Sequence, residues 1–131
     1  MIRYTADESD LMAADFLNLA MQVWPGSYEI GKTEEALHRT LNITARVDGL
    51  LVGCLRILTD GYYFGTITEL LVLPSFQGQG IGSQLLRLAK EYTPTILYFG
   101  AQPGLEHFYE KNGCQKGMQS YVIDSGTYGC C

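Results

Sequence analysis

A short glycine loop between a strand-like run and a helical pattern constrains this chain more than any other segment. The run from Phe64 to Leu73 is rich in aliphatic and β-branched residues and stops at Pro74, which cannot donate to a strand ladder. Glycines follow at positions 78, 80 and 82, where a helical pattern begins. Exposed backbone N–H groups and the helix dipole attract an anion at such a junction. The loop therefore predicts a phosphate or pyrophosphate site, with an ordinary tight turn as the alternative.

Two familiar phosphate loops do not fit these residues. A P-loop needs Gly-Lys followed by Ser or Thr, and Ile81-Gly82-Ser83 supplies no lysine. A dinucleotide fingerprint needs a glycine where Ser83 stands and an acid about 20 residues further on, but no Asp or Glu lies between Tyr92 and Leu105. Nucleotide hydrolysis and a nicotinamide cofactor are therefore disfavoured.

The segment before the loop predicts a strand, two helices and a hairpin. Ile2 to Tyr4 has strand character, and apolar residues then recur at helical spacing up to Val23. Thr33, followed by two glutamates, is typical of the N-cap of a second helix. The runs Ile43 to Val47 and Leu50 to Leu58 are joined by Asp48-Gly49, which favours a two-residue hairpin turn.

Beyond the loop the pattern predicts a crossover from strand to helix to strand. The helical face comprises Ile81, Leu85, Leu88, Ala89 and Tyr92, and Pro94 ends it. Thr95 to Phe99 is interpreted as a buried strand, and Tyr121 to Ile123 as a last short strand. A further short helix is expected after Pro103-Gly104, with Leu105, Phe108 and Tyr109 facing inward and Gly113 at its C-terminal cap.

Composition narrows the classes of protein. The 131 residues, of which 47% are hydrophobic, suit one soluble domain spanning 1–131, and the formal charge of −5 argues against nucleic acid as a partner. No apolar run reaches the ~18 residues needed to cross a bilayer, so we expect no membrane partner and a cytoplasmic location. The cysteines lack the spacing of a metal site, so no metal is expected, and adjacent Cys130 and Cys131 are interpreted as a frayed tail.

The loop and its flanks together resemble one known family. Gln77-Gly78-Gln79-Gly80-Ile81-Gly82 resembles the Gln/Arg-x-x-Gly-x-Gly/Ala acyl-CoA motif of the GNAT N-acyltransferase superfamily, and Phe108 to Gly113 resembles its Phe-Tyr-x-x-x-Gly segment. The resemblance implies an α/β (α+β) fold with a central mixed, mostly antiparallel sheet flanked by helices. Cys114 departs from the family, which usually has an aromatic residue there. Few residues remain after Gly113, so the family's C-terminal arm is either short or replaced by a neighbouring subunit in a homodimer.

The resemblance also implies how acetyl-CoA, as co-substrate, would be held. Backbone N–H groups from Gln79 to Ser83 would bind the pyrophosphate, and Gln77 would line the loop. Backbone groups of Leu71 and Leu73 would receive the pantetheine arm in the manner of an added strand, and Val72 would aim its N–H at the thioester oxygen. The full set of coenzyme-binding residues implied is Leu71, Val72, Leu73, Gln77, Gly78, Gln79, Gly80, Ile81, Gly82 and Ser83.

Acyl transfer to an amine also needs a base and a proton donor. Strict alternation places Glu69 on the same face as Ile67 and Leu71 in an apolar strand, which favours it as the base. A bulge that turns Glu69 to water is the alternative, and His107 is a weaker rival. By the resemblance, Tyr109 would donate to the leaving thiolate; packing in the core is its alternative role.

The expected function is transfer of an acetyl group from acetyl-CoA to a primary amine of a small molecule by direct attack. Acceptor specificity is expected from the first two helices and nearby loops, and His38 is one residue available to line that pocket. Two alternatives remain open: acetylation of a protein or peptide amine, and a non-catalytic acyl-CoA-binding sensor.

Overall fold

The computed structural model describes residues 1–125, which form two compact units. The first unit comprises Met1–Phe99 and the second begins at Gly100. The expectation of a single domain over 1–131 stays a prediction.

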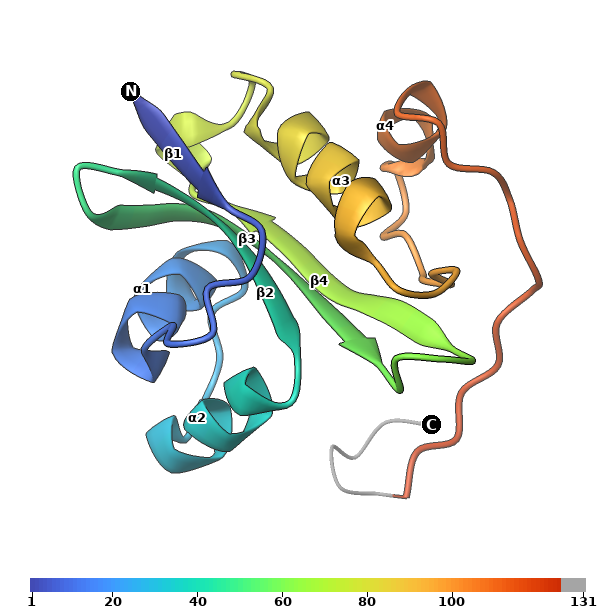
Figure 1. Ribbon diagram of the computed structural model, residues 1–131, viewed down its shortest axis with the longest axis horizontal. Helices are drawn as coiled ribbons and strands as arrows, with labels where there is room; N and C mark the ends of the chain where they lie inside the picture. The colour runs from blue at the N-terminus through green and yellow to red at the C-terminus, as the bar shows by residue number, and fades with distance from the viewer. Residues whose placement is uncertain (126–131) are drawn as a thin grey trace. The chain divides into compact units, whose positions relative to one another are not determined.

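The first unit is built on a four-stranded antiparallel sheet in the order β1-β2-β3-β4 (Figure 1). Its strands are β1 (Ile2–Thr5), β2 (Leu41–Val47), β3 (Leu50–Thr59) and β4 (Gly65–Val72). The hairpin between β2 and β3 is confirmed. Both residues of its turn have positive φ, 49° at Asp48 and 85° at Gly49, as a two-residue turn of this kind requires.

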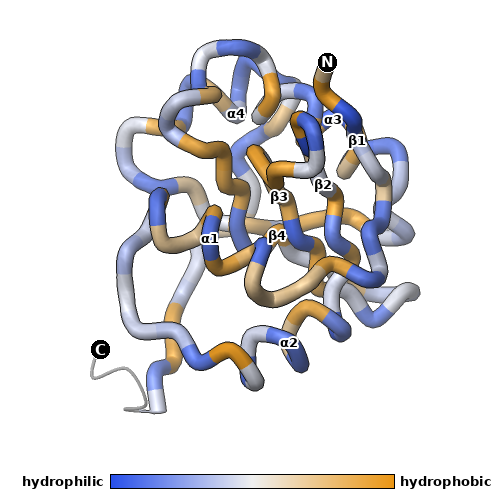
Figure 2. Tube along the Cα trace, turned by 90° about the vertical axis from the view of Figure 1, so that its left-hand side faces the viewer, coloured by the Kyte–Doolittle hydropathy of each residue, from blue (hydrophilic) through white to orange (hydrophobic). Residues whose placement is uncertain are grey.

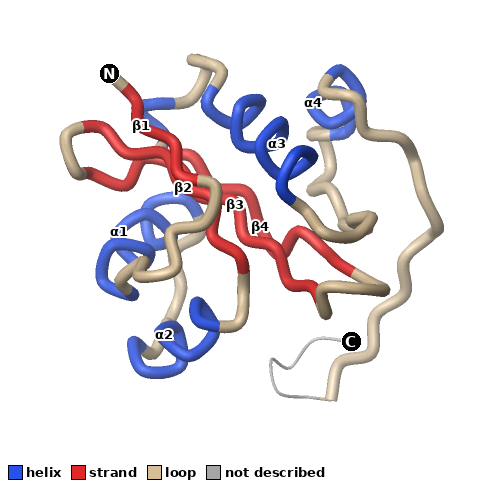
Figure 3. Tube along the Cα trace, in the orientation of Figure 1, coloured by secondary structure: helices blue, strands red, loops and turns tan. Residues whose placement is uncertain are grey.

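Helices cover both faces of the sheet, as Figure 3 shows. On one face lie α1 (Ala13–Val23) and α2 (Ile30–His38), and on the other lies α3 (Ile81–Tyr92). Figure 2 shows hydrophobic stretches along β3, between these layers. The largest fully buried side chains include Leu19, Leu37, Ile43, Leu55, Ile57, Leu71, Ile81 and Leu85. The expected sheet flanked by helices is therefore confirmed.

Two helical details differ from the expectation. The second helix begins at Ile30, with Glu29 at the N-cap, and not at Thr33. Thr33 lies one turn inside, where its N–H and its hydroxyl both donate to the carbonyl of Glu29, at 3.0 and 2.8 Å. A hydroxyl that satisfies the preceding turn replaces the cap we expected. In α3, Leu86 is buried in place of Leu88, and Tyr92 is exposed.

The two later strands that the apolar runs predicted are absent from the described residues. The segment 95–99 makes a single parallel bridge, between Leu97 and Gly65, and the N–H of Tyr98 donates to the Gly65 carbonyl at 3.0 Å. Ile96 in this segment is 70% exposed, so the expected burial is wrong. Tyr121, Val122 and Ile123 are also exposed and lie outside any strand.

The second unit contains α4 (Glu106–Lys111), the short helix expected after Pro103-Gly104. Gly113 has φ of 87° just beyond it, which confirms the left-handed cap. Leu105 is exposed, so only Phe108 and Tyr109 of the expected inward face are partly buried.

A carboxylate on the β1–α1 connection ties the first unit together. Glu8 Oε2 accepts from Arg46 Nη2 at 2.6 Å, and Glu8 Oε1 accepts from the Thr44 hydroxyl at 2.8 Å. Arg46 also pairs with Asp15 of α1 at 3.1 Å. Burial alone would raise the pKa of Glu8, but the hydrogen bonds from Arg46 and Thr44 outweigh it, so this pKa lies below its ordinary value. The ion pair thus links α1 to β2.

The depressed pKa of Glu8 predicts how stability depends on pH. A carboxylate with a lower pKa in the folded state stabilises the fold above its unfolded pKa, ordinarily 4.5, and that contribution is lost as pH falls through the folded pKa. We therefore expect the free energy of unfolding to fall below about pH 4.5, and to fall less in Glu8→Gln. Urea titrations between about pH 3 and 7 measure this, with the exposed Glu34→Gln as control. Parallel curves for wild type and Glu8→Gln would contradict it.

Candidate active site

The glycine loop connects the end of β4 to the start of α3 through one short 3₁₀ turn, η1 (Pro74–Phe76). Gly78 and Gly80 both adopt left-handed backbone conformations, with φ of 79° and 83°. A side chain at either position would be strained, because L residues rarely adopt this region. Ile81 anchors the far end of the loop in the core, where it is fully buried. The loop is therefore held at both ends while its middle stays open.

The start of α3 presents backbone donors that the helix does not use. Gly80 is the N-cap residue and α3 has no side-chain cap. The Gln84 N–H donates to the Gly80 carbonyl at 3.1 Å, so the N–H groups of Ile81, Gly82 and Ser83 precede the first bond of the helical ladder. No atom lies within 4 Å of a Cβ built on Gly78 or Gly80. This donor set and the open space beside it fit the diphosphate of an acyl-CoA.

Gln77 connects the loop to the end of β4. Its Nε2 donates to the Val72 carbonyl at 3.0 Å, and its N–H donates to the Pro74 carbonyl at 3.3 Å. The side chain therefore fastens the loop to the end of β4. A neutral amide can donate this bond to the carbonyl.

The hydrogen bonds of β4 change which backbone groups are available to a pantetheine arm. The Leu73 N–H donates to the Val52 carbonyl at 2.8 Å and so faces β3. Because direction alternates along an antiparallel strand, the backbone groups of Leu71 face β3 as well, and those of Leu70 and Val72 face the outer edge. The contact of Val72 with Gln77 agrees with this. The Val72 N–H therefore faces the outer edge, whereas the backbone groups of Leu71 and Leu73 face β3; the coenzyme roles expected of these residues stay predictions.

A bulge in β4 sets the direction of Glu69. Arg56 lies opposite Glu69 while Ile57 lies opposite Ile67, so Thr68 has no residue opposite it. The extra residue places Glu69 on the same face as Leu71 but on the opposite face from Ile67. The expectation from strict alternation is therefore wrong for Ile67. The alternative of a solvated carboxylate is wrong as well, because the Glu69 side chain is only 12% exposed.

Sequence reasoning missed the partner of Glu69. Arg56 of β3 donates through Nε to Glu69 Oε2, and through Nη2 to Glu69 Oε1 at 2.9 Å. Its guanidinium also lies 5.2 Å from the centre of the Phe16 ring of α1. Burial alone would lower the pKa of Arg56, but its hydrogen bonds to Glu69 and the charge of that carboxylate raise it overall. A basic residue inside the apolar run from Leu50 to Leu58 was the signal that could have identified it.

Tyr109 lies on α4, in the second unit. Its ring packs edge-on against Phe108, with ring centres 5.1 Å apart. Burial raises the pKa of the Tyr109 phenol, and the charge of Cys114 adds to this. The phenol therefore keeps its proton at neutral pH, as a hydrogen-bond donor must. The rival base His107 is exposed on the same helix.

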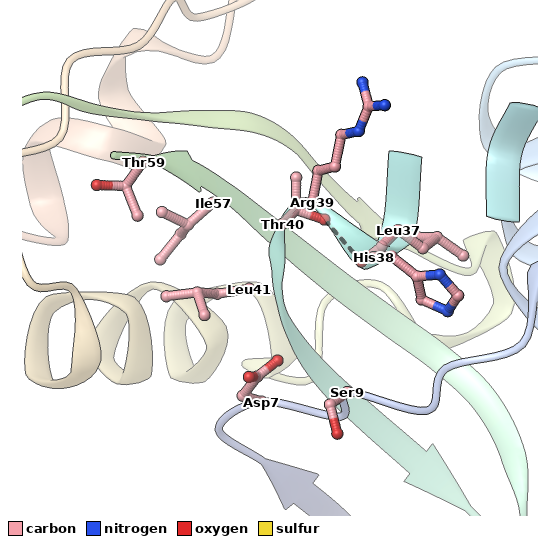
Figure 4. A pocket seen from close by; sticks show the side chains of 9 residues that line it. All are labelled: Asp7, Ser9, Leu37, His38, Arg39, Thr40, Leu41, Ile57 and Thr59. Atoms are coloured by element: carbon pink, nitrogen blue, oxygen red, sulfur yellow. Dashed lines mark hydrogen bonds between the residues drawn. The ribbon is translucent and has the colours of Figure 1, made fainter. Parts of the chain in front are cut away.

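The cavity that His38 lines is a separate feature (Figure 4). Its volume is about 330 Å³, and its lining residues are Asp7, Ser9, Leu37, His38, Arg39, Thr40, Leu41, Ile57 and Thr59. It lies where the end of α2 meets the start of β2 and the end of β3. None of the expected coenzyme-binding or catalytic residues lines it. In Figure 4 the guanidinium of Arg39 points away from the Asp7 carboxylate.

Two absences concern the part of the chain that the structure describes. Residues 1–125 hold no group of three or more His, Cys, Asp or Glu placed to bind a metal ion, and Cys130 and Cys131 lie outside them. Within the same residues, every helix is too short or too polar to span a bilayer.

These features together define a class: a sheet flanked by helices, with a glycine loop that presents unused backbone donors between an edge strand and a helix. The model of the acetyltransferase (GNAT) domain matches residues 39–115, which is more than half of the chain. The chain belongs to the GNAT acetyltransferase family. A curated protein of Gibberella zeae that carries a provisional acetyltransferase name is 29% identical over 87 residues, which cover 56% of this chain and 49% of that protein. The match thus spans about half the length of that relative.

Solved structures agree on the fold. A GNAT family acetyltransferase of Streptococcus pneumoniae has a TM-score of 0.78 at 23% identity, covering 95% of this chain and 99% of that chain. A ribosomal-protein-alanine N-acetyltransferase of Brucella melitensis has a TM-score of 0.68 at 23% identity, covering 96% and 99%. An aminoglycoside N-acetyltransferase in complex with CoA has a TM-score of 0.68 at 17% identity, covering 95% and 93%. The sequence-based assignment of family and fold is confirmed.

Proposed function

We propose that this protein transfers an acetyl group from acetyl-CoA to a primary amine of a small molecule by direct attack. The observation that carries the proposal is the loop at Gly78 and Gly80, which connects the outward-facing backbone of Val72 at the end of β4 to the unused N–H groups at the start of α3. Acetyl-CoA, when bound, supplies the activated acyl thioester. Every other requirement falls on residues of the chain.

The loop and the edge of β4 divide the binding task. The N–H groups from Gln79 to Ser83 would hold the diphosphate, since those at the start of α3 are not used by the helix and open space lies beside Gly78 and Gly80. The arm would lie along the edge of β4, where Leu70 and Val72 present backbone groups in place of Leu71 and Leu73. The Val72 N–H would then donate to the thioester oxygen and stabilise the negative charge that develops there.

Glu69 is proposed to accept the proton of the amine through a water molecule. It precedes Val72 by three residues, which separates their Cα atoms by about 10 Å along a strand. A carboxylate at that separation reaches an amine beside Val72 more readily through a bridging water than directly. Such general base catalysis typically contributes about 10²–10⁴ in rate.

Tyr109→Phe tests the proposed proton donor. We expect turnover to fall by about 10- to 100-fold, because the leaving thiolate loses its hydrogen-bond donor, with the Kd of CoA changed less than about twofold. Steady-state rates and calorimetric titration of CoA measure the two quantities. Phe108→Leu is the matched control, since it removes the neighbouring ring and leaves the phenol in place. An unaltered rate in Tyr109→Phe would remove this residue from the mechanism.

A cationic small molecule is the proposed class of acceptor. The formal charge of −5 favours cationic acceptors over acidic metabolites. The similar structures include one enzyme named for aminoglycosides and one named for a ribosomal protein. A protein or peptide amine is therefore the nearer alternative, and an acyl-CoA sensor without turnover is the more distant one. We also propose a cytoplasmic location, where acetyl-CoA is available, with light scattering to separate monomer from homodimer.

One experiment tests donor, reaction and acceptor together. CoA release from acetyl-CoA is followed with a panel of polyamines, aminoglycosides, amino acids and N-terminal peptides. Release that depends on a small-molecule amine supports the proposal, and release with peptides alone favours the nearer alternative. Saturable CoA binding by calorimetry without turnover on the whole panel would favour the sensor.

A further inference from the structure

The ion pair between Arg56 and Glu69 carries an inference that rests on the proposed function and deepens it. Both side chains are largely buried, with 15% and 12% of their surfaces exposed, and they lie opposite each other on β3 and β4. We propose that Arg56 is a positioning residue that fixes the orientation of the Glu69 carboxylate for the acceptor amine.

The geometry of the pair restricts Glu69 to one orientation. Arg56 donates from Nε to one carboxylate oxygen and from Nη2 to the other. Two parallel bonds of this kind hold the plane of the carboxylate as well as its position. Each oxygen keeps a second lone pair, so the carboxylate still accepts from a water or an ammonium group. The amine therefore meets an acceptor whose direction is already set.

Phe16 of α1 holds the guanidinium in turn. Its ring centre lies 5.2 Å from Cζ of Arg56, and the ring itself is buried. A planar guanidinium can lie over an aromatic face while its edge donates to a carboxylate, which a lysine ammonium cannot do. Arg56 of β3 thus contacts both Phe16 of α1 and Glu69 of β4. The orientation of Glu69 then depends on the helical layer beside it.

The bulge at Thr68 brings this pair together. If every residue of β4 were kept and paired regularly, without the bulge, Glu69 would lie on the face with Ile67, away from Phe16 and α1. A bulge redirects a side chain and leaves one residue of the ladder unpaired. Its position next to Glu69 therefore supports a role for the direction of this carboxylate. The acceptor would therefore approach from the face that α1 and α2 cover.

The first test is a double-mutant cycle on acetyl transfer. In Arg56→Gln we expect kcat to fall about 10- to 100-fold, while the Kd of CoA changes less than about twofold. In the Glu69→Gln background the same substitution is expected to have almost no further effect on kcat, because Arg56 acts through the carboxylate. Equal effects in both backgrounds would overturn the proposal, since Arg56 would then act independently of Glu69.

The second test is chemical rescue, which a purely structural arginine would not show. Arg56→Ala leaves a space beside Glu69, and added guanidinium at millimolar concentration is expected to restore kcat by at least about fivefold, with Arg56→Lys intermediate between wild type and Arg56→Ala. Arg46→Ala is the matched control, because Arg46 also pairs with carboxylates, Glu8 and Asp15, but has no contact with Glu69 among the interactions described. Guanidinium is expected to leave its kcat unchanged. Absence of rescue in Arg56→Ala would overturn the proposal.

CoA binding and turnover together distinguish a loss of folding from a loss of catalysis. CoA titration of each variant reports whether the folded site remains, so a variant that binds CoA normally and turns over slowly has lost catalysis only. If no amine supports turnover by the wild type, both the proposed function and this inference fail. If the wild type turns over and Arg56→Gln matches it, only the inference fails.

Discussion

Replacing Gly80 with valine is expected to raise the Kd of CoA at least about tenfold, which corresponds to about 1.4 kcal/mol. Gly80 has φ of 83° at the N-cap of α3, and open space lies where a Cβ would stand. A β-branched residue is strained in this region by about 1–3 kcal/mol, and its methyl groups would fill the space that the diphosphate needs. Calorimetric titration with CoA measures the effect.

Gly61→Val supplies the control for backbone strain. Gly61 has φ of 82° and likewise no atom within 4 Å of a built Cβ, but it lies in the turn between β3 and β4. Both variants are expected to lose a similar amount of stability in urea titrations, and only Gly80→Val is expected to lose affinity for CoA. If Gly80→Val bound CoA as tightly as the wild type, the loop would not be the diphosphate site.

Glu69→Gln is expected to lower kcat by about 10²–10³ while leaving the Kd of CoA almost unchanged. The amide cannot accept the proton of the amine, so the remaining activity should rise with pH as free amine becomes available in solution. Rates between about pH 6 and 10 measure both effects. A pH profile like that of the wild type would show that Glu69 only stabilises the sheet.

The stability of Glu69→Gln must be measured with its activity. Removing one partner of a largely buried ion pair typically costs about 3–5 kcal/mol, because the remaining charge loses its partner. Glu8→Gln is the control, since it removes the carboxylate that pairs with Arg46 and leaves the proposed site untouched. That variant is expected to lose stability and to keep its kcat.

The sequence was sufficient where a local signal determines local structure. Asp48-Gly49 specified the hairpin because both residues tolerate positive φ. Pro74 marked the end of β4, and the spaced glycines marked the loop because they permit left-handed conformations and a close approach of backbone to an anion. These features require no knowledge of distant residues.

The sequence was insufficient where a distant partner decides. The bulge at Thr68 arises from the pairing of β4 with β3, and no glycine or proline at this position indicates it in the sequence. Arg56 becomes part of the candidate site only because that bulge turns Glu69 toward it. The run 95–99 has strand composition, but one bridge to Gly65 is all the pairing it makes among the described residues. β propensity describes a half-buried surface, and it cannot say whether a neighbouring strand is present.

The extra residue in β4 has a consequence for how this protein can change. Because Thr68 is the extra residue, Ile67 and Glu69 lie two positions apart yet face opposite sides of the sheet, and Leu71 shares the side of Glu69. Regular pairing of all eight residues with β3 would leave the composition of the strand intact, yet it would force one half of β4 to exchange sides. A change in the register of β4 against β3 therefore alters the candidate site even where every residue of the strand is kept.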